Sequence, residues 1–438
     1  MVVSFTLRKI CCFHRVALLM SMTSEQISSS RAQLLGKVNQ IVQETPALDM
    51  HTHLYDPVFG DLLLYGIDEQ LIYHYLVAEA FRSTSMPYDD FWKLTREQQA
   101  DHVWKTLFVE RSPLSEACRG VLTSLNKLGL ETEPDALPSI RQWFREQKLE
   151  GFVTHCMEVA NLRGICMTNS PFDPQEKVVW DRNPSRDERF LTGLRLDPLL
   201  LEWGSAGQDL RSWGYQVDED LGVTTMQEII RFLHDWKARI HPLYLMVSLP
   251  PSFAYPTQDS TTKILKEAVL PFCRETGLPL ALMIGVKRAV NPQLQLAGDG
   301  LGRADLRALE NLCAENQDVK FLSTVLSREN QQELCVIVRK FRNLHIFGCW
   351  WFTNIPSIIE EMTRLRLELL GTSFTAQHSD ARVLDQVIYK WDHSRKIIGE
   401  VLTDKYFDLQ QTGWNVTNEA IRSDVNDLLG ARFESFCR

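Results

Sequence analysis

The chain has 438 residues, of which 44% are hydrophobic, 24% charged and 10% aromatic. These proportions are typical of a globular protein with a full core, and they exclude a largely disordered or collagen-like chain. Its 47 basic residues are outnumbered by 56 acidic ones, and the formal net charge of −9 argues against a nucleic-acid-binding surface. No uninterrupted apolar run of about 18 residues is present, so no membrane-spanning segment is predicted.

The first twenty residues resemble a signal peptide only weakly. Charged residues such as Arg8 and Arg15 interrupt the apolar part, and no clean small-x-small cleavage site follows. A misplaced start is the preferred interpretation, with Met20 or Met22 as the true first residue, and export is the less favoured alternative. The ten cysteines are scattered without a C-x-x-C pair, and several lie in apolar runs, as Cys335 does. We therefore expect buried free thiols in a reducing compartment and a cytoplasmic protein.

The predicted elements begin with a polar helix over residues 24–42. The short apolar run 47–51 follows and ends in a turn, which is typical of a buried strand. The block from residue 68 to 151 contains helical stretches without a strong strand, and it is too large for a loop, so a helical insertion is predicted. Its expected helices cover residues 69–82, 96–109, 114–128 and 139–147.

Beyond residue 151, apolar strand-like runs alternate with amphipathic helices. The runs cover residues 163–168, 190–196, 243–249, 278–285, 319–324, 344–348 and 372–376. The helices are expected over 225–240, 261–276, 304–315, 328–341, 355–370 and 381–401, with one more packed helix in the tail over 412–438.

Near-continuous apolar strands separated by helices indicate an α/β fold with a parallel sheet that is buried on both faces. With residues 47–51 the runs make eight strands, which suggests a closed (β/α)8 TIM-type barrel with its chemistry at the carboxyl ends of the strands. The predicted organisation is an N-terminal extension and helix over residues 1–45 and a barrel domain over 46–438. The barrel domain includes the helical insertion, over residues 66–150, and a C-terminal helix.

The sharpest local signal for chemistry is Asp49-Met50-His51-Thr52-His53. Residues two apart in an extended chain point the same way, so His51 and His53 project together at the end of the first strand. Two neutral imidazoles on one side form half of a site for a divalent metal. Two satisfied or solvent-facing histidines are the alternative, but the position at the end of a first barrel strand favours the metal.

A second signal follows the last predicted strand, where Asp380 and Arg382 occur. The first and eighth strands of a closed barrel are neighbours, so Asp380 would face His51 and His53 and complete a three-ligand site with open positions. A helix N-cap or first-turn carboxylate is the alternative for Asp380, and both interpretations can hold at once. Arg382 is either a solvated helix residue or a planar clamp for a carboxylate.

The order of these motifs resembles the uronate (glucuronate) isomerase family, an isomerase branch of the amidohydrolase superfamily. The His-x-His pair matches, and so does the Asp-x-Arg after strand eight, although the family usually has Thr-Asp-Ser-Arg where this chain has Ser379-Asp380-Ala381-Arg382. Further segments resemble the family in the same order: Ile72-Tyr73-His74-Tyr75, Thr168-Asn169-Ser170-Pro171-Phe172-Asp173, Leu194-Arg195-Leu196-Asp197, Ile284-Gly285 with Arg288, and Gly348-Cys349-Trp350-Trp351-Phe352-Thr353-Asn354. Each motif is weak alone, and their shared order from Pro46 onward is what makes the resemblance specific.

One departure from the family pattern is Met283, which stands where the family tends to have a histidine before Ile-Gly. A thioether is a poor ligand for a hard or borderline divalent ion. The retained set of His51, His53 and Asp380 would still suffice for a three-ligand site. The resemblance therefore implies one divalent metal, with Zn²⁺ as the first choice and Mn²⁺ or Fe²⁺ accepted by the same ligands.

The resemblance implies an aldose–ketose isomerase that acts on a hexuronic acid, either D-glucuronate to D-fructuronate or D-galacturonate to D-tagaturonate. A proton must leave C2 and return to C1 through an enediol(ate), which needs a positioned base and acid. Tyr75 is expected to shuttle this proton if a nearby cation lowers its pKa from about 10, with Asp380 as the alternative base. Only one of Tyr73 and Tyr75 is expected to serve the site if the segment is helical.

The other implied site residues hold the substrate. Arg195 and Arg288, like Arg382, are expected to neutralise the substrate carboxylate or a developing oxyanion. His74 is expected to hydrogen-bond sugar hydroxyls. Trp350 and Trp351 are either packing residues or an apolar wall against a sugar face.

Two rival functions stay open. A metal-dependent hydrolase of the same superfamily would use Asp380 as base for a metal-bound water, although the predicted strand ends offer no lysine to bridge two metals. A non-catalytic sugar-acid binding protein is the second rival, and Met283 motivates it. The expected partner is a small sugar acid, without nucleic acid or membrane, and a homo-oligomer is one expected state because enzymes of this size are often symmetric.

Overall fold

A computed structural model of the chain describes residues 24–438. The weak signal-like segment and its two candidate starts, Met20 and Met22, lie outside the described residues. Within the described part every cysteine is free and almost all are buried, as predicted. No helix between residues 24 and 438 combines the length and apolar character that a membrane crossing needs.

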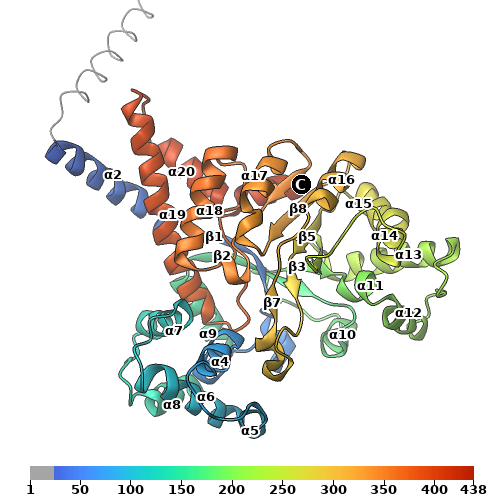
Figure 1. Cartoon of the computed structure of the whole chain (residues 1–438), viewed down its shortest axis with the longest axis horizontal. Coiled ribbons are helices and arrows are strands. Elements are labelled where there is room, and N and C mark those ends of the chain that lie inside the picture. The colour runs from blue at the N-terminus through green and yellow to red at the C-terminus, as the bar shows by residue number, and fades with distance from the viewer. Residues whose placement is uncertain (1–23) are drawn as a thin grey trace, which may run out of the picture.

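A curled sheet of seven parallel strands forms the centre of the molecule, with helices around it (Figure 1). Its strands pair in the order β1-β2-β3-β4-β5-β8-β9, so each strand lies beside the next one that the chain supplies to this sheet. The α/β barrel-like fold is thus confirmed. The strands are β1 (Ala47–Thr52), β2 (Leu162–Asn169), β3 (Phe190–Arg195), β4 (Leu245–Leu249), β5 (Leu280–Ile284), β8 (Phe321–Val325) and β9 (Leu344–Ile346).

The strands are apolar along their whole length because both of their faces are covered. One set of alternate residues packs outward against the helices, and the other set fills the interior of the barrel. Leu48, Met246 and Met283 belong to the interior cluster, which also contains Phe433 from the C-terminal end of the chain. The barrel centre is therefore a packed core, and the functional groups are left to its rim.

The eighth strand predicted over residues 372–376 is reduced to one isolated bridge, between Phe347 and Thr375. The other edge of this segment meets the C-terminal tail, since Ala376 donates its N–H to the Leu428 carbonyl at 2.9 Å. Closure onto β1 comes further along, where the N–H of His53 donates to the Ala381 carbonyl at 2.8 Å. The prediction of a regular eighth strand is therefore wrong, because the tail takes the hydrogen bonds that a longer strand would make.

The segment between β1 and β2 is helical, as predicted, apart from short connections and a 3-10 turn at Pro57–Leu62. Two of its helices, α5 and α9, were not among the predicted helices; the boundaries of the insertion as a domain stay a prediction. Its helices are α3 (Ile67–Leu71), α4 (His74–Ala80), α5 (Tyr88–Lys93), α6 (Arg96–Trp104), α7 (Glu116–Lys127), α8 (Leu137–Arg145) and α9 (Leu149–Val159). The helix before β1 is α2 (Ser24–Glu44).

The later helices alternate with the strands, as predicted, although the first three of them were not among the predicted helices. They are α10 (Pro174–Asp181), α11 (Asp197–Leu201), α12 (Trp203–Ser212), α13 (Val223–Ile240), α14 (Ser260–Ile264), α15 (Leu270–Thr276), α16 (Arg307–Glu315), α17 (Gln331–Val338) and α18 (Pro356–Leu370). A two-stranded ribbon, β6 (Val286–Lys287) and β7 (Gly300–Leu301), follows β5.

Two helical predictions near the C-terminus are corrected. Helix α19 (Gln386–Gln411) begins five residues later than predicted, because the Gln386 side chain accepts the N–H groups of the two preceding loop residues Arg382 and Val383. The tail is two helices, α20 (Asn418–Asn426) and α21 (Arg432–Cys437), rather than one. They are separated at Gly430, whose φ of +135° and close approach to β1 leave no room for a side chain.

Candidate active site

His51 and His53 leave the end of β1 on the same side, and the loop after the closing segment brings Asp380 to them. The two Nε2 atoms lie 3.5 and 3.4 Å from the same oxygen, Asp380 Oδ1. One ligand atom from each residue lies within 4.8 Å of the others. The convergence that the sequence predicts, across more than three hundred residues, is therefore present in the fold.

Hydrogen bonds at the back of each ring fix which nitrogen faces Asp380. The Tyr244 hydroxyl donates to the Met50 carbonyl at 2.8 Å, so its oxygen is left to accept from His51 Nδ1, 3.4 Å away. Thr168 Oγ1 likewise donates to the backbone and lies 3.3 Å from His53 Nδ1. With the proton on Nδ1, each ring presents the lone pair of Nε2 to the centre, which is the arrangement of a histidine metal ligand.

Asp380 is held in an unusual backbone conformation, with a φ of +53°. The residue before it, Ser379, donates its N–H to Asp49 Oδ1 at 2.9 Å, and the other oxygen of Asp49 accepts from Trp391 Nε1 at 2.8 Å. Burial raises the pKa of the Asp49 carboxyl, which makes these donated bonds important to its ionised form. Since α19 begins only at Gln386, Asp380 is not a helix N-cap, and the ligand interpretation is favoured.

The donor set fits a divalent cation. Burial lowers the pKa of His53 to about 4, so this imidazole is neutral near pH 7. Burial opposes the ionisation of Asp380, but His51 and His53 outweigh it and hold the pKa of the carboxyl well below its ordinary value. Asp380 Oδ1 is buried without a hydrogen-bond partner. Two imidazoles and one carboxylate oxygen are ligands that Zn²⁺, Mn²⁺ and Fe²⁺ all accept.

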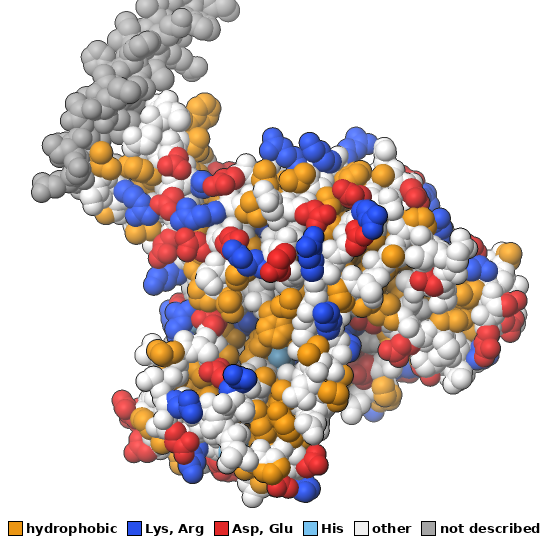
Figure 2. Space-filling view, in the orientation of Figure 1, with side chains coloured by type: hydrophobic (Ala, Val, Ile, Leu, Met, Phe, Trp, Pro, Cys, Tyr) orange, Lys and Arg blue, Asp and Glu red, His pale blue; other side chains and the backbone are white. Residues whose placement is uncertain are grey.

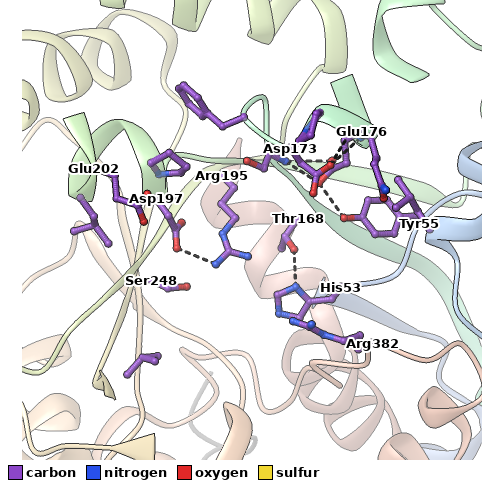
Figure 3. Close-up of a pocket in the computed structure, with 18 of the residues that line it drawn as sticks. His53, Tyr55, Thr168, Asp173, Glu176, Arg195, Asp197, Glu202, Ser248 and Arg382 are labelled. Carbon is purple, nitrogen blue, oxygen red and sulfur yellow. Dashed lines mark hydrogen bonds and ion pairs between the residues drawn. The ribbon is translucent and has the colours of Figure 1, made fainter. Parts of the chain in front are cut away.

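The metal-ligand cluster lines an inner cavity of about 80 Å³, which adjoins an outer cavity of about 970 Å³. Four of the predicted residues line both: His53, Arg195, Arg288 and Arg382. Figure 3 shows His53 and Arg382 on one side of the outer cavity and Arg195 facing them. A site of this combined size suits a small-molecule substrate with its reactive end placed in the inner part.

The three predicted arginines differ in whether a protein carboxylate pairs with them. Arg195 Nη2 is paired with Asp197 at 2.8 Å, and Arg288 Nη1 with Asp299 at 2.6 Å. Arg382 forms no ion pair with any carboxylate of residues 24–438. It is therefore the guanidinium that is available to bind a substrate anion without losing a partner.

His74 and both tryptophans line the inner cavity, as the resemblance implies. Trp351 Nε1 donates to His74 Nε2 at 2.8 Å, so the second ring nitrogen of His74 carries the proton and can donate it to a ligand. Burial lowers the pKa of His74 to about 3, which keeps the ring neutral. Trp350 and Trp351 are almost fully buried and still contribute to the wall, so packing and lining occur together.

Tyr75 does not meet the expected condition for a proton carrier. Its ring lies 5.7 Å from the Lys390 ammonium, yet burial prevails and raises its pKa well above the ordinary value. The Tyr75 hydroxyl is buried without a hydrogen-bond partner, and the cavity wall contains Tyr73 instead. The expected lowering of the pKa is therefore wrong, and a catalytic role for Tyr75 stays a prediction.

Sequence reasoning missed two groups near the site. Lys390 lies on α19, fully buried, and burial lowers the pKa of its amine. Glu176 on α10 lines the outer cavity and accepts hydrogen bonds from the Tyr55 hydroxyl at 2.9 Å and from Asn169 Nδ2 at 3.0 Å. A charged residue in a helix is usually solvated, so neither stood out. Met283, by contrast, is buried in β5 and lines neither cavity.

Solved structures give a direct comparison for this arrangement. A uronate isomerase from Bacillus halodurans C-125 matches with a TM-score of 0.92 and 49% sequence identity, over 95% of this chain and 97% of that one. The chain belongs to the uronate isomerase family. A uronate isomerase from Thermotoga maritima has the same fold, with a TM-score of 0.76 and 13% identity over 93% of this chain and 97% of that one. So does a glucuronate isomerase from Caulobacter crescentus, with a TM-score of 0.72 and 13% identity over 95% of this chain and 97% of that one. No protein-family model matches this family member, and no curated protein does.

Proposed function

We propose that the chain interconverts an aldose hexuronic acid and its ketose, D-glucuronate with D-fructuronate or D-galacturonate with D-tagaturonate. One observation carries the proposal: a three-ligand centre and an unpaired guanidinium, Arg382, line the same cavity. A hexuronate needs both features, because it has a carbonyl at one end and a carboxylate at the other. Membership of the uronate isomerase family supports the same substrate class.

The substrate carboxylate is assigned to Arg382. Binding there brings a negative charge to a guanidinium that no protein carboxylate neutralises, whereas Arg195 already faces Asp197. Placing C6 at Arg382 directs C1 and C2 towards His51, His53 and Asp380. A divalent cation held by these three residues, with Zn²⁺ as the first choice, would supply a positive charge that stabilises negative charge on the sugar oxygens.

The reaction moves one proton from C2 to C1 and one from O2 to O1, so the electrons are redistributed within the sugar and no co-reactant is consumed. Asp380 is ionised and can accept a proton at its free oxygen. The Nδ1–H of His74, in the wall of the inner cavity, can hold a substrate hydroxyl in place. Trp350 and Trp351 give the inner cavity an apolar wall against which a sugar face can pack.

The hydrolase rival lacks a specific observation in its favour. Residues 24–438 contain one cluster of three potential metal ligands, and Lys390, the buried lysine nearby, lies on a helix rather than at a strand end. The site therefore resembles a mononuclear centre. Release of an amine or an opened lactone in place of a ketose would support the rival.

The test is a ketose-formation assay with D-glucuronate and D-galacturonate, with and without a chelator. Asp380→Asn is expected to lower kcat/KM by about a thousandfold or more, because it removes both a ligand charge and a proton acceptor. Asp305→Asn, at an exposed aspartate paired with Arg307, is the matched control and should leave the rate unchanged. Full activity of the Asp380→Asn variant would exclude the site, and ketose formation by neither substrate would exclude the function.

A further inference from the structure

A third cavity, of about 520 Å³, lies at the opposite end of the barrel from the candidate active site. Its wall includes Leu344 and His345, the first residues of β9, whereas the catalytic side chains follow the last residues of the strands. The ends of α17 and α18 and the C-terminal helix α21 also line it. Figure 2 shows basic side chains along the edge of the molecule where α17 and the C-terminus lie in Figure 1.

The cavity is basic in a chain that is acidic overall. Arg339, Arg342 and Arg432 line it, and no aspartate or glutamate does. None of the three is ion-paired with a carboxylate of residues 24–438, although exposed arginines elsewhere, such as Arg307 and Arg328, are. Arg432 is bonded instead to a hydroxyl, that of Ser373, at 3.2 Å.

Helix dipoles account for the positions of only two of the three arginines. Arg339 and Arg342 follow the C-terminus of α17, where cations are stabilised. Arg432, however, is the first residue of α21, the end of a helix at which a cation is disfavoured. A bound anion would stabilise the positive charges of all three guanidiniums at once.

The rest of the wall is apolar and contains rings. Phe436 is half-buried, and its ring lies 5.2 Å from the ring of His345 at an interplanar angle of 28°. His345 is 3% exposed and is anchored by Thr375 Oγ1, 2.9 Å from its Nε2. Burial, followed by the charges of Arg432 and Arg366, lowers the pKa of His345 to about 3, so its ring is neutral. A flat or apolar group can therefore pack here beside the guanidiniums.

We propose that this cavity binds an organic phosphate that carries two or more phosphoryl groups on a flat or apolar body, of which a nucleoside diphosphate is the simplest example. Three guanidiniums match the roughly three negative charges of a diphosphate at neutral pH, and arginine binds phosphoryl oxygens in a bidentate way. The volume lies within the range of small-ligand sites, about 300–1,000 Å³. The site is separate from the proposed catalytic function and does not depend on it.

The test is titration calorimetry on the full chain with three probes: ADP, inorganic pyrophosphate and adenosine. ADP is expected to bind one per chain and more tightly than pyrophosphate, with adenosine weakest. The double substitution Arg342→Gln with Arg432→Gln should weaken ADP binding by about a hundredfold, roughly tenfold for each lost charge-assisted contact. Arg307→Gln is the matched control and should bind like the wild type, since Arg307 is exposed and lines none of the three cavities described.

A second readout does not depend on the variants. ADP should slow hydrogen exchange in residues 338–344 and 432–436 of the wild type. Absence of saturable ADP binding at millimolar concentration, or equal binding by the double variant, would overturn the proposal. Equal affinity for pyrophosphate and ADP would overturn the assignment of the apolar wall. Loss of ADP binding in Arg382→Met, with retention in the double variant, would place the ligand in the catalytic cavity and also overturn it.

Discussion

Two regions of the barrel are built in different ways. One is the main sheet of seven strands, and the other is the closing segment, residues 347–383, which joins the last strand to the first. Most strands of the main sheet pair in register, apart from irregularities between β1 and β2, and they are buried almost throughout. The closing segment has only two isolated bridges, Phe347 with Thr375 and Val383 with Leu64, and it contains Gly348, Trp351 and Asp380 at positive φ. The same segment supplies Asp380, Arg382 and both tryptophans to the site. Regular pairing thus provides stability. The chemistry lies where the pairing becomes irregular, at the end of β1 with His51 and His53, and in the closing segment, where the backbone conformation is less favourable.

Among substitutions that affect stability and activity together, the largest expected effect is from Gly348→Ala in the closing segment. A Cβ there would lie 1.8 Å from His378 Nδ1, and the φ of +59° disfavours any side chain. Because the His378 ring packs 5.2 Å from that of His51, the clash should reach the metal ligands. We expect a loss of more than about 3 kcal/mol in the free energy of unfolding and at least about a hundredfold in kcat/KM. Gly204→Ala, with open space around it, is the control in urea unfolding and in the assay.

A substitution in the regular sheet should separate stability from activity. Leu282 lies in the middle of β5 with no exposed surface, and its change to Ala is expected to cost about 3 kcal/mol in the free energy of unfolding. The kcat of the folded fraction should not change, because Leu282 belongs to the outer core cluster. A fall in kcat without a fall in stability would contradict the division between the two regions.

The stability of the protein is expected to depend on pH through Glu176, at the rim of the barrel. Burial raises the pKa of its carboxyl from 4.5 to about 7. The folded state therefore keeps a proton that the unfolded chain releases, and the wild type should lose up to about 3 kcal/mol of stability as the pH rises from 4.5 to 7.

Glu176→Gln carries no charge at any pH and should lack this loss, so the difference in stability between the two proteins should change across that range. Urea unfolding at several pH values between 4.5 and 8 measures it, with Glu310→Gln on the exposed side of α16 as control. If the free energies of unfolding of the wild type and Glu176→Gln change with pH in parallel, Glu176 is ionised in the folded state over the whole range from pH 4.5 to 8, which would contradict the prediction.

Arg382→Met tests whether the Arg382 guanidinium binds the substrate carboxylate. We expect kcat/KM for a hexuronate to fall by about a hundredfold, mainly through KM, because one charge-assisted contact to the carboxylate is lost. Metal content should not change, since Arg382 is not a ligand. Arg328→Met, at an exposed arginine paired with Glu361, should match the wild type. Loss of metal in place of loss of substrate affinity would assign Arg382 to the metal centre.

The smallest expected effect is from Trp351→Phe. It keeps a ring in the wall and removes the donor to His74 Nε2, so the orientation of that imidazole is no longer fixed. A fall of about tenfold in kcat/KM is expected, with unchanged metal content. Trp414→Phe, at an exposed tryptophan that lines neither cavity, is the control. An unchanged rate would show that His74 needs no such orientation.

The sequence predicts the regular part of this molecule well. Apolar runs located the seven strands of the main sheet, because strands buried on both faces leave an unbroken local pattern, whereas the short ribbon of β6 and β7 was not predicted. His51 and His53 could be found for a similar reason, as alternation along a strand is local. Asp380 could be added only through the neighbourhood of first and last strands and the family resemblance.

The closing region could not be predicted in detail because its structure depends on distant residues. Thr372–Ala376 fails to form a full strand since Ala376 bonds Leu428 of the tail. The late start of α19 reflects the Gln386 side chain, which accepts from the backbone of Arg382 and Val383. The Asp385 carboxylate just before the helix accepts in turn from Gly66 at 2.9 Å and from Gln70 in the insertion. No local propensity carries such information. The pKa of Tyr75 was missed for the same reason, since burial by other elements decides its direction.

The most direct test of the central claim is anomalous diffraction from crystals of the active enzyme, combined with its metal content. We predict one divalent cation per chain, within bonding distance of His51 Nε2, His53 Nε2 and Asp380 Oδ1. An enzyme that isomerises hexuronates with a metal elsewhere, or with none, would contradict the account.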